Sequence, residues 1–201
     1  MTTTISRLYN SYTDAKEAVR SLETAGLSHN DISIMASNAE GWYKGKDHDR
    51  DNDGTDDRAE GAAKGAGIGA ALGGGVGLLT GLGLLAIPGV GPVVAAGWLA
   101  ATAAGAVAGG ATGGIVGALT EAGVSKDDAE VYAEGIRRGG ALVTARVPDG
   151  ERAKYEAVMD RAAINVRERG TAYRQSGWSG YDPNASPYTR EQVTAERNLY
   201  R

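Results

Sequence analysis

Apolar and polar residues follow two rhythms in residues 1–37, and together these rhythms predict a β-α-β unit. Residues 3–9 alternate loosely, and residues 31–36 alternate clearly, between apolar and polar side chains, which is typical of short strands. Residues 13–25 lie between them with apolar side chains at helical spacing, and Gly26 follows as a C-cap. The apolar positions of this predicted helix are Ala15, Ala18, Val19 and Leu22.

A second β-α-β unit is expected in residues 122–169, after one additional helix. The capping-box pattern that starts at Ser125 begins this helix over residues 126–138. Residues 141–147 and 163–169 alternate as strands. A helix between these strands has Tyr155, Val158, Met159 and Ala162 on one side. Two β-α-β units with four antiparallel strands predict an α+β domain of the ferredoxin-like type, with two helices on one sheet face.

A charge-free segment from Gly65 to Thr120 separates the two units and has small residues at every fourth position. This spacing places them along one ridge of a helix, so it predicts an inserted glycine-zipper α-helical hairpin over residues 61–121, turning at residues 88–92. The candidate zipper positions are Gly61, Gly65, Gly69, Gly73, Gly77 and Gly81 in the first arm, and Gly97, Ala101, Gly105, Gly109, Gly113 and Gly117 in the second. Such a ridge lets a second helix approach closely, so we expect helix association.

Lipid and further copies of the chain are the two candidate partners of this hairpin. Each arm of about 25 residues is long enough to cross a hydrocarbon core. Insertion is only marginally favourable, because glycine and alanine contribute little apolar area and neither flank is enriched in lysine or arginine. We therefore expect a homo-oligomer with membrane lipid as a second partner. Spanning, dipping and fully soluble hairpins all remain open.

Residues 38–60 form a polar, acidic linker that also matches a calcium-binding loop. The spacing from Asp49 to Glu60 is that of an EF-hand loop, with Gly54 at its sharp turn. The candidate calcium ligands are Asp49, Asp51, Asp53, the carbonyl group of Thr55, and Glu60. Position eight is Asp56 where an apolar residue is usual, and no amphipathic helix precedes the loop. A plain charged linker is the main expectation, and Ca²⁺ is the alternative.

Residues 170–201 form a tail rich in aromatic and polar residues. The pattern Thr189-Arg-Glu-Gln192 is a capping box and predicts a terminal helix over residues 190–200. The segment from Trp178 to Pro183 is expected to form an ordered turn anchored by its aromatic side chains. Packing on the domain body is the main expectation for the tail, and docking to a partner is the alternative.

Composition narrows the classes of function. The net charge is −4 and the pI is about 5.3, which argues against nucleic acid as the main partner. There is no cysteine, and no combination of nucleophile, base and orienting group is evident, so we expect no enzyme activity. Arg137 and Arg138 are expected to favour a helix C-terminus, with an anionic ligand as the alternative. The N-terminus lacks signal-peptide features, which favours the cytoplasm or the cytoplasmic face of the inner membrane.

Three sequence runs resemble a known family. They are Gly83-Leu-Leu-Ala-Ile-Pro-Gly-Val-Gly-Pro92, Tyr132-Ala-Glu-Gly-Ile-Arg-Arg-Gly-Gly140 and Leu142-Val-Thr-Ala-Arg146. Together with the β-α-β start, they resemble the bacterial general stress proteins of the heat-induced YflT-like family, which have a central glycine zipper. The resemblance covers residues from about 4 to 170 and implies a stress-linked, non-enzymatic role.

The sequence leaves three functions open. The first is a stress-response protein that oligomerises through its zipper and associates with the membrane. The second is a soluble homo-oligomeric scaffold, such as a filament or shell, packed through the zippers. The third is a sensor of a small ligand, which rests on fold-level analogy alone, or of calcium, which rests on the loop spacing from Asp49 to Glu60.

Overall fold

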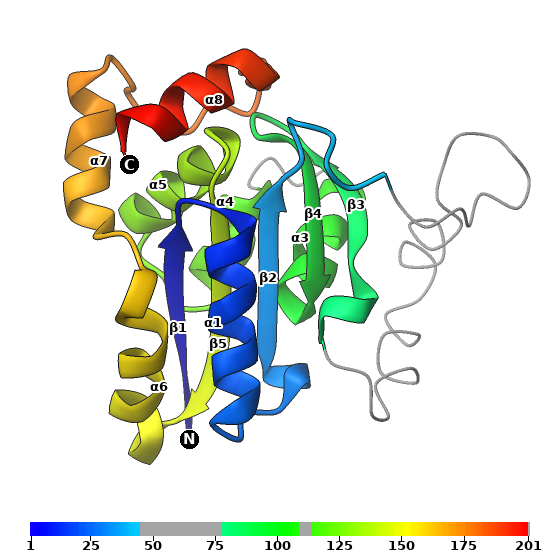
Figure 1. Ribbon diagram of the computed structural model, residues 1–201, viewed down its shortest axis with the longest axis vertical. Helices are drawn as coiled ribbons and strands as arrows, with labels where there is room; N and C mark the ends of the chain where they lie inside the picture. The colour runs from blue at the N-terminus through cyan, green and yellow to red at the C-terminus, as the bar shows by residue number, and fades with distance from the viewer. Residues whose placement is uncertain (45–77, 109–113, 201) are drawn as a thin grey trace, which may run out of the picture.

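The sheet is the centre of the fold in the computed structural model, which describes residues 1–44, 78–108 and 114–200 (Figure 1). Within these residues five antiparallel strands lie in the order β1-β5-β2-β4-β3. The strands are β1 (Thr2–Tyr9), β2 (Ile32–Ser37), β3 (Gly83–Ile87), β4 (Gly91–Gly97) and β5 (Ala141–Pro148). Strand β5 therefore lies between β1 and β2, although it follows them by more than a hundred residues.

Helices cover both faces of this sheet, so the domain has the mixed α+β character that the sequence predicts. The helices are α1 (Tyr12–Thr24), α3 (Trp98–Ala108), α4 (Gly114–Glu121), α5 (Lys126–Arg137), α6 (Arg152–Met159), α7 (Val166–Gln175) and α8 (Arg190–Leu199). Short 3₁₀ turns occur at His29–Asp31, Leu78–Gly81, Asp149–Glu151 and Asp160–Ala162. In Figure 1, α1 lies in front of the sheet, while α3, α4 and α5 lie behind it.

The strands contribute side chains to two separate apolar cores, one on each face of the sheet. Helices α1 and α6 pack on one face, with side chains such as Val19 and Met159 against Ile34 and Val143. Helices α3, α4 and α5 pack on the other face, where they bury residues such as Leu8, Met35 and Leu142. Burial of this kind is the main favourable contribution to folding.

Several predicted elements are confirmed, and their ends have identifiable causes. Helix α1 begins after Ser11, whose hydroxyl oxygen accepts a hydrogen bond from the Asp14 amide, and helix α5 begins after Ser125 in the same way. The predicted strands over 3–9, 31–36 and 141–147 correspond to β1, β2 and β5. Helix α1 was predictable because its buried residues lie on one side. The strands were predictable because apolar residues recur at every second position, as Ile32 and Ile34 do in β2, although β2 and β5 are buried on both faces.

The prediction of two long helices over residues 61–121 is wrong for residues 83–97. They form the β-hairpin of β3 and β4, and β4 pairs with β2 along the sheet. Gly89 and Gly91 at the turn have φ values of +70° and +103°, which L side chains rarely adopt. Strand β4 is buried on both faces, so its apolar run lacks the alternation that distinguishes a strand from a helix. Residues 98–108 and 114–121 of the predicted hairpin are helical, as α3 and α4.

The expected last strand over residues 163–169 is also mostly wrong. One antiparallel bridge joins Ile164 to Leu8, and helix α7 begins two residues later. Asn165 stops the strand because its side-chain oxygen accepts hydrogen bonds from the amides of Arg167 and Glu168, as an N-cap does. The local cap therefore determines the structure here rather than the alternation of Ile164 and Val166.

Candidate functional site

The tail is an ordered part of the structure, as the sequence predicts, and residues 176–200 are called the C-terminal strap below. Its helix α8 crosses the end of the sheet near α5 and α7 (Figure 1). Thr189 and Gln192 form the predicted capping box at the start of α8. Before α8, the Tyr181 hydroxyl donates a 2.6 Å hydrogen bond to the Pro88 carbonyl oxygen at the turn between β3 and β4.

Two glycines of that turn provide the space in which the strap lies. A Cβ atom on Gly89 would overlap the backbone of Asp182, and one on Gly91 would lie 2.7 Å from Cβ of Pro187. On α8, Val193 packs so closely on Gly139 that this position also has no room for a side chain. The absence of side chains at these glycines therefore allows the strap to lie in close contact with the body.

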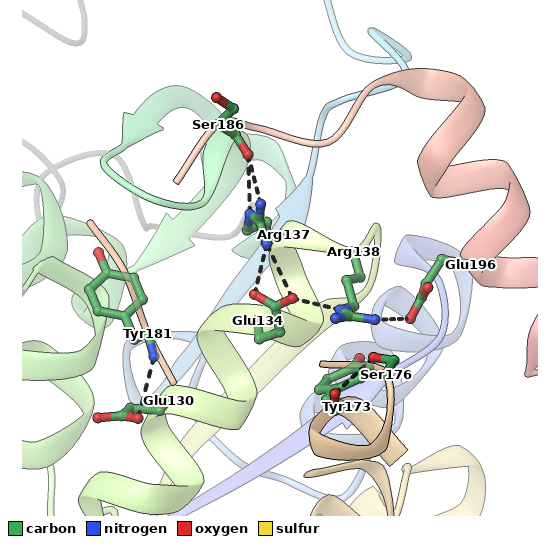
Figure 2. Close-up of polar contacts among 9 residues, drawn as sticks. All are labelled: Glu130, Glu134, Arg137, Arg138, Tyr173, Ser176, Tyr181, Ser186 and Glu196. Carbon is green, nitrogen blue, oxygen red and sulfur yellow. Dashed lines mark hydrogen bonds and ion pairs between the residues drawn. The ribbon is translucent and has the colours of Figure 1, made fainter. Parts of the chain in front are cut away.

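A cluster of alternating charges, named the ion cluster here, joins the strap to the end of α5 (Figure 2). Glu134 accepts hydrogen bonds from Arg137 at 3.2 Å and from Arg138 at 2.6 Å. Arg138 also donates a 2.8 Å hydrogen bond to Glu196 of the strap. Only 5% of the Glu134 side chain and 8% of the Arg138 side chain are exposed, so these charges depend on one another for compensation.

The arginines of the ion cluster have further contacts that fix their positions. Arg137 donates two hydrogen bonds to the Ser186 carbonyl oxygen, at 3.2 and 2.9 Å (Figure 2). The guanidinium carbon of Arg138 lies 4.2 Å from the ring centre of Tyr173, in cation–π contact. Burial alone would lower the pKa of Arg138, but its hydrogen bonds to Glu196 and Glu134 outweigh burial and raise it. Arg138 therefore stays charged at any pH at which the protein is folded.

The ion cluster joins the strap to the body through ion pairs and hydrogen bonds. Each of its four charged groups contacts a group of opposite charge. Burial raises the pKa of the neighbouring Tyr173 hydroxyl, so this group stays protonated near neutral pH. The arrangement holds the strap in place and activates neither a nucleophile nor a base.

The sequence did not predict this cluster: it assigned Arg137 and Arg138 mainly to the helix C-terminus, with an anionic ligand as the alternative. The separation of Glu134 from Arg137 and Arg138 by three and four residues was the available signal, because such pairs lie on one side of a helix. The partner Glu196 lies 58 residues beyond Arg138, at a separation that no local pattern indicates.

A small cleft lies beside the ion cluster, between the end of β1, α7 and α8. The cleft has a volume of about 20 Å³ and is partly open to solvent. Its polar lining consists mainly of Asn10, Arg138, Arg169, Glu196 and Arg197, with the rings of Tyr9, Tyr173 and Tyr200. It is thus a cleft with three guanidinium groups.

The predicted zipper glycines within the described residues do not form one continuous ridge. Gly81 belongs to a 3₁₀ turn, and Gly97 ends β4 with a φ of +93°, where a Cβ atom would overlap the carbonyl oxygen of Ile32. Gly105 of α3 and Gly117 of α4 are helical, and a Cβ atom on either would meet nothing within 4 Å. The predicted positions Gly61, Gly65, Gly69, Gly73, Gly77, Gly109 and Gly113 lie outside the described residues.

The candidate calcium ligands also lie outside the part of the chain that the structure describes. They are Asp49, Asp51, Asp53, Thr55 and Glu60. Within residues 1–44, 78–108 and 114–200, no group of three or more histidine, aspartate or glutamate side chains is placed to hold a metal ion.

No helix in the described ranges has the length and apolar character needed to cross a bilayer. The described part of the charge-free segment contains instead β3, β4, α3 and α4, which bury residues such as Val93, Leu99 and Leu119 in the second core.

Comparison with known proteins gave no match to any family model, curated protein or solved structure.

Proposed function

We propose that this protein is a non-enzymatic bacterial stress-response protein that acts by associating with copies of itself. The observation that supports self-association is the outer surface of α3. Residues 98–108 carry no charge, and Thr102 is their only polar side chain. Ala101 and Gly105 nevertheless lie exposed on this helix, one turn apart, while Leu99 and Ala103 face the core.

An apolar, small outer surface of this kind suits close contact with a second helix. A surface helix of a globular protein usually has polar side chains on its outer side. The row formed by Ala101 and Gly105 has no side chain beyond a methyl group, which allows two helix backbones to approach closely. Contact between α3 helices of two copies would cover this row. The predicted helix association is therefore proposed for α3, although residues 83–97 are not helical.

We also propose that the fold is a ferredoxin-like core to which the β3–β4 hairpin, α3, α4 and α5 are added. It is supported by the order β1-β5-β2 with α1 and α6 on one face. The bridge between Ile164 and Leu8 lies on the far side of β1, where such a fold has its fourth strand. We further propose, from the sequence alone, a location in the cytoplasm or at the cytoplasmic face of the inner membrane.

Changing both small residues of α3 to leucine, as A101L/G105L, should convert the oligomer into a monomer of 20.6 kDa. The two side chains would hold a partner helix away from the ridge. They should not unfold the chain, because leucine is a better helix former than glycine by about 1 kcal/mol. The molar mass is measured by light scattering after gel filtration, over a range of concentrations.

Ala153 and Ala157 provide the matched control, because they are exposed and one turn apart on α6. The double variant A153L/A157L adds the same bulk on the opposite helix layer and should keep the wild-type mass. A wild-type protein that elutes with the monomer mass at every concentration would refute self-association, and equal dissociation in both double variants would refute the α3 interface.

Membrane association is a second candidate function, and the charge-free segment from Gly65 to Thr120 favours it. Flotation with phosphatidylcholine–phosphatidylglycerol vesicles, without detergent, tests it directly. Protein that floats and resists alkaline carbonate supports lipid contact, whereas protein that stays at the bottom as a large particle supports the oligomer alone.

A further inference from the structure

We propose that the cleft beneath α8 binds a small oxyanion, such as a phosphate or carboxylate group. Three guanidinium groups line it, from Arg138, Arg169 and Arg197. This site is separate from the α3 surface proposed for self-association and does not depend on it.

The three arginines differ in how their charges are compensated. Arg138 pairs with Glu134 and Glu196, and Arg197 pairs with Glu40 at 2.7 Å. Arg169, in contrast, hydrogen-bonds the neutral side chain of Asn10 at 3.0 Å, and none of the described carboxylates lies within ion-pair distance. Arg169 is therefore the one arginine of the three that has no described carboxylate as a partner.

Arg197 has one nitrogen without a hydrogen-bond partner among the described residues. Nε of Arg197 is buried without a hydrogen-bond partner, although the other two nitrogens of this guanidinium reach Glu40. An unpaired donor in a protein interior is costly, so native structures usually provide an acceptor for it. An oxyanion bound in the cleft would compensate the charge of Arg169.

Size and shape narrow the ligand class. A cleft of about 20 Å³ has room for one water-sized group, which corresponds to a single oxygen atom of a ligand. The cleft is partly open, so the remainder of the ligand would stay in solvent. The guanidinium carbon of Arg169 lies 3.8 Å from the ring centre of Tyr200, and this cation–π contact restrains the side chain. A restrained guanidinium group suits a planar or tetrahedral oxyanion.

The position of the cleft couples binding to the strap. Glu196, Arg197 and Tyr200 come from α8, whereas Asn10 and Arg138 belong to the body. A ligand that contacts both sides would hold α8 against the body. Occupancy should therefore slow amide hydrogen exchange in residues 190–200.

The test titrates inorganic phosphate, and separately acetate, into the full-length protein while sodium chloride keeps the ionic strength constant. Thermal unfolding and amide exchange of residues 190–200 are the readouts. Wild-type protein should show a saturable rise in Tm with slower exchange. R169Q should weaken the apparent affinity about tenfold or more, because a charge-assisted hydrogen bond is lost.

R167Q is the matched control, since Arg167 is exposed on the same helix two residues before Arg169. It should bind as the wild type does, and R169K should keep part of the affinity even if R169Q folds poorly. Vesicles of phosphatidylcholine with phosphatidic acid, compared with phosphatidylcholine alone, separate a lipid headgroup from a free anion. Binding to either source supports the site. No saturable response from any anion or vesicle, or equal losses in R169Q and R167Q, would overturn it.

Discussion

Replacing Gly97 by alanine is expected to lower the free energy of unfolding by about 3 kcal/mol. Gly97 has a φ of +93° at the end of β4, a conformation that costs a residue with a Cβ atom about 1–2 kcal/mol. The added atom would also overlap the carbonyl oxygen of Ile32 and lie 2.8 Å from Cα of Ser33. These are backbone atoms that cannot rotate away, so overpacking adds about 1–3 kcal/mol. Urea unfolding followed by circular dichroism measures the change.

Gly105 provides the control, because it belongs to the same every-fourth series of glycines in the sequence. It lies exposed within α3, and a Cβ atom there would meet nothing within 4 Å. Alanine at this position should raise the free energy of unfolding by about 1 kcal/mol. If both substitutions were equally tolerated, Gly97 would not end a strand as the structure has it.

Replacing Glu134 by alanine is expected to cost about 3–5 kcal/mol, because it leaves buried arginine charge without its central partner. Arg137 and Arg138 both donate to this carboxylate, which is 5% exposed. Loss of Glu134 should also weaken the strap, since Arg138 is the link to Glu196. Denaturant unfolding gives the free energy, and amide exchange in α8 reports the release of the strap.

Glu130 lies one turn earlier on α5 and is the appropriate comparison. Its side chain is 23% exposed and pairs at 3.9 Å with Lys126, which is 76% exposed. It also accepts a 3.4 Å hydrogen bond from the Tyr181 amide, so E130A should cost about 1 kcal/mol. E134Q keeps the shape of the side chain and isolates the contribution of its charge. Similar losses in E130A and E134A would show that the ion cluster contributes no more than an ordinary surface pair.

The elements that sequence predicts well are those with strong local signals. Ser125 and Thr189 begin helices through side-chain hydrogen bonds made within three residues, so the pattern and the structure coincide. Asn165 offers a signal of the same kind, and the alternation of Ile164 with Val166 concealed it. Here the Asn165 side chain, which accepts hydrogen bonds from free amide groups, determines the structure rather than the apolar alternation.

The elements that sequence predicts poorly depend on distant partners. Strand β4 is defined by its pairing with β2 and by cores on both of its faces, and neither is visible in residues 91–97. The ion cluster and the cleft depend on contacts between α5 and a strap more than forty residues away. A regular spacing of glycines therefore predicted one continuous ridge where tertiary packing produced a turn, a strand end and two helices.

The place of β5 in the sheet determines when this protein can fold during its synthesis. Thr2 pairs with Pro148, and β5 separates β1 from β2 along the whole of their length. A ribosome must therefore complete nearly three quarters of the chain before β1 is joined to the rest of the sheet. The uncharged stretch emerges earlier, when β2 can pair with β4 but strand β5 has not yet been made. Such long-range closure is intrinsically slow and leaves apolar surface exposed meanwhile, so the nascent chain is the form of this protein most in need of a chaperone.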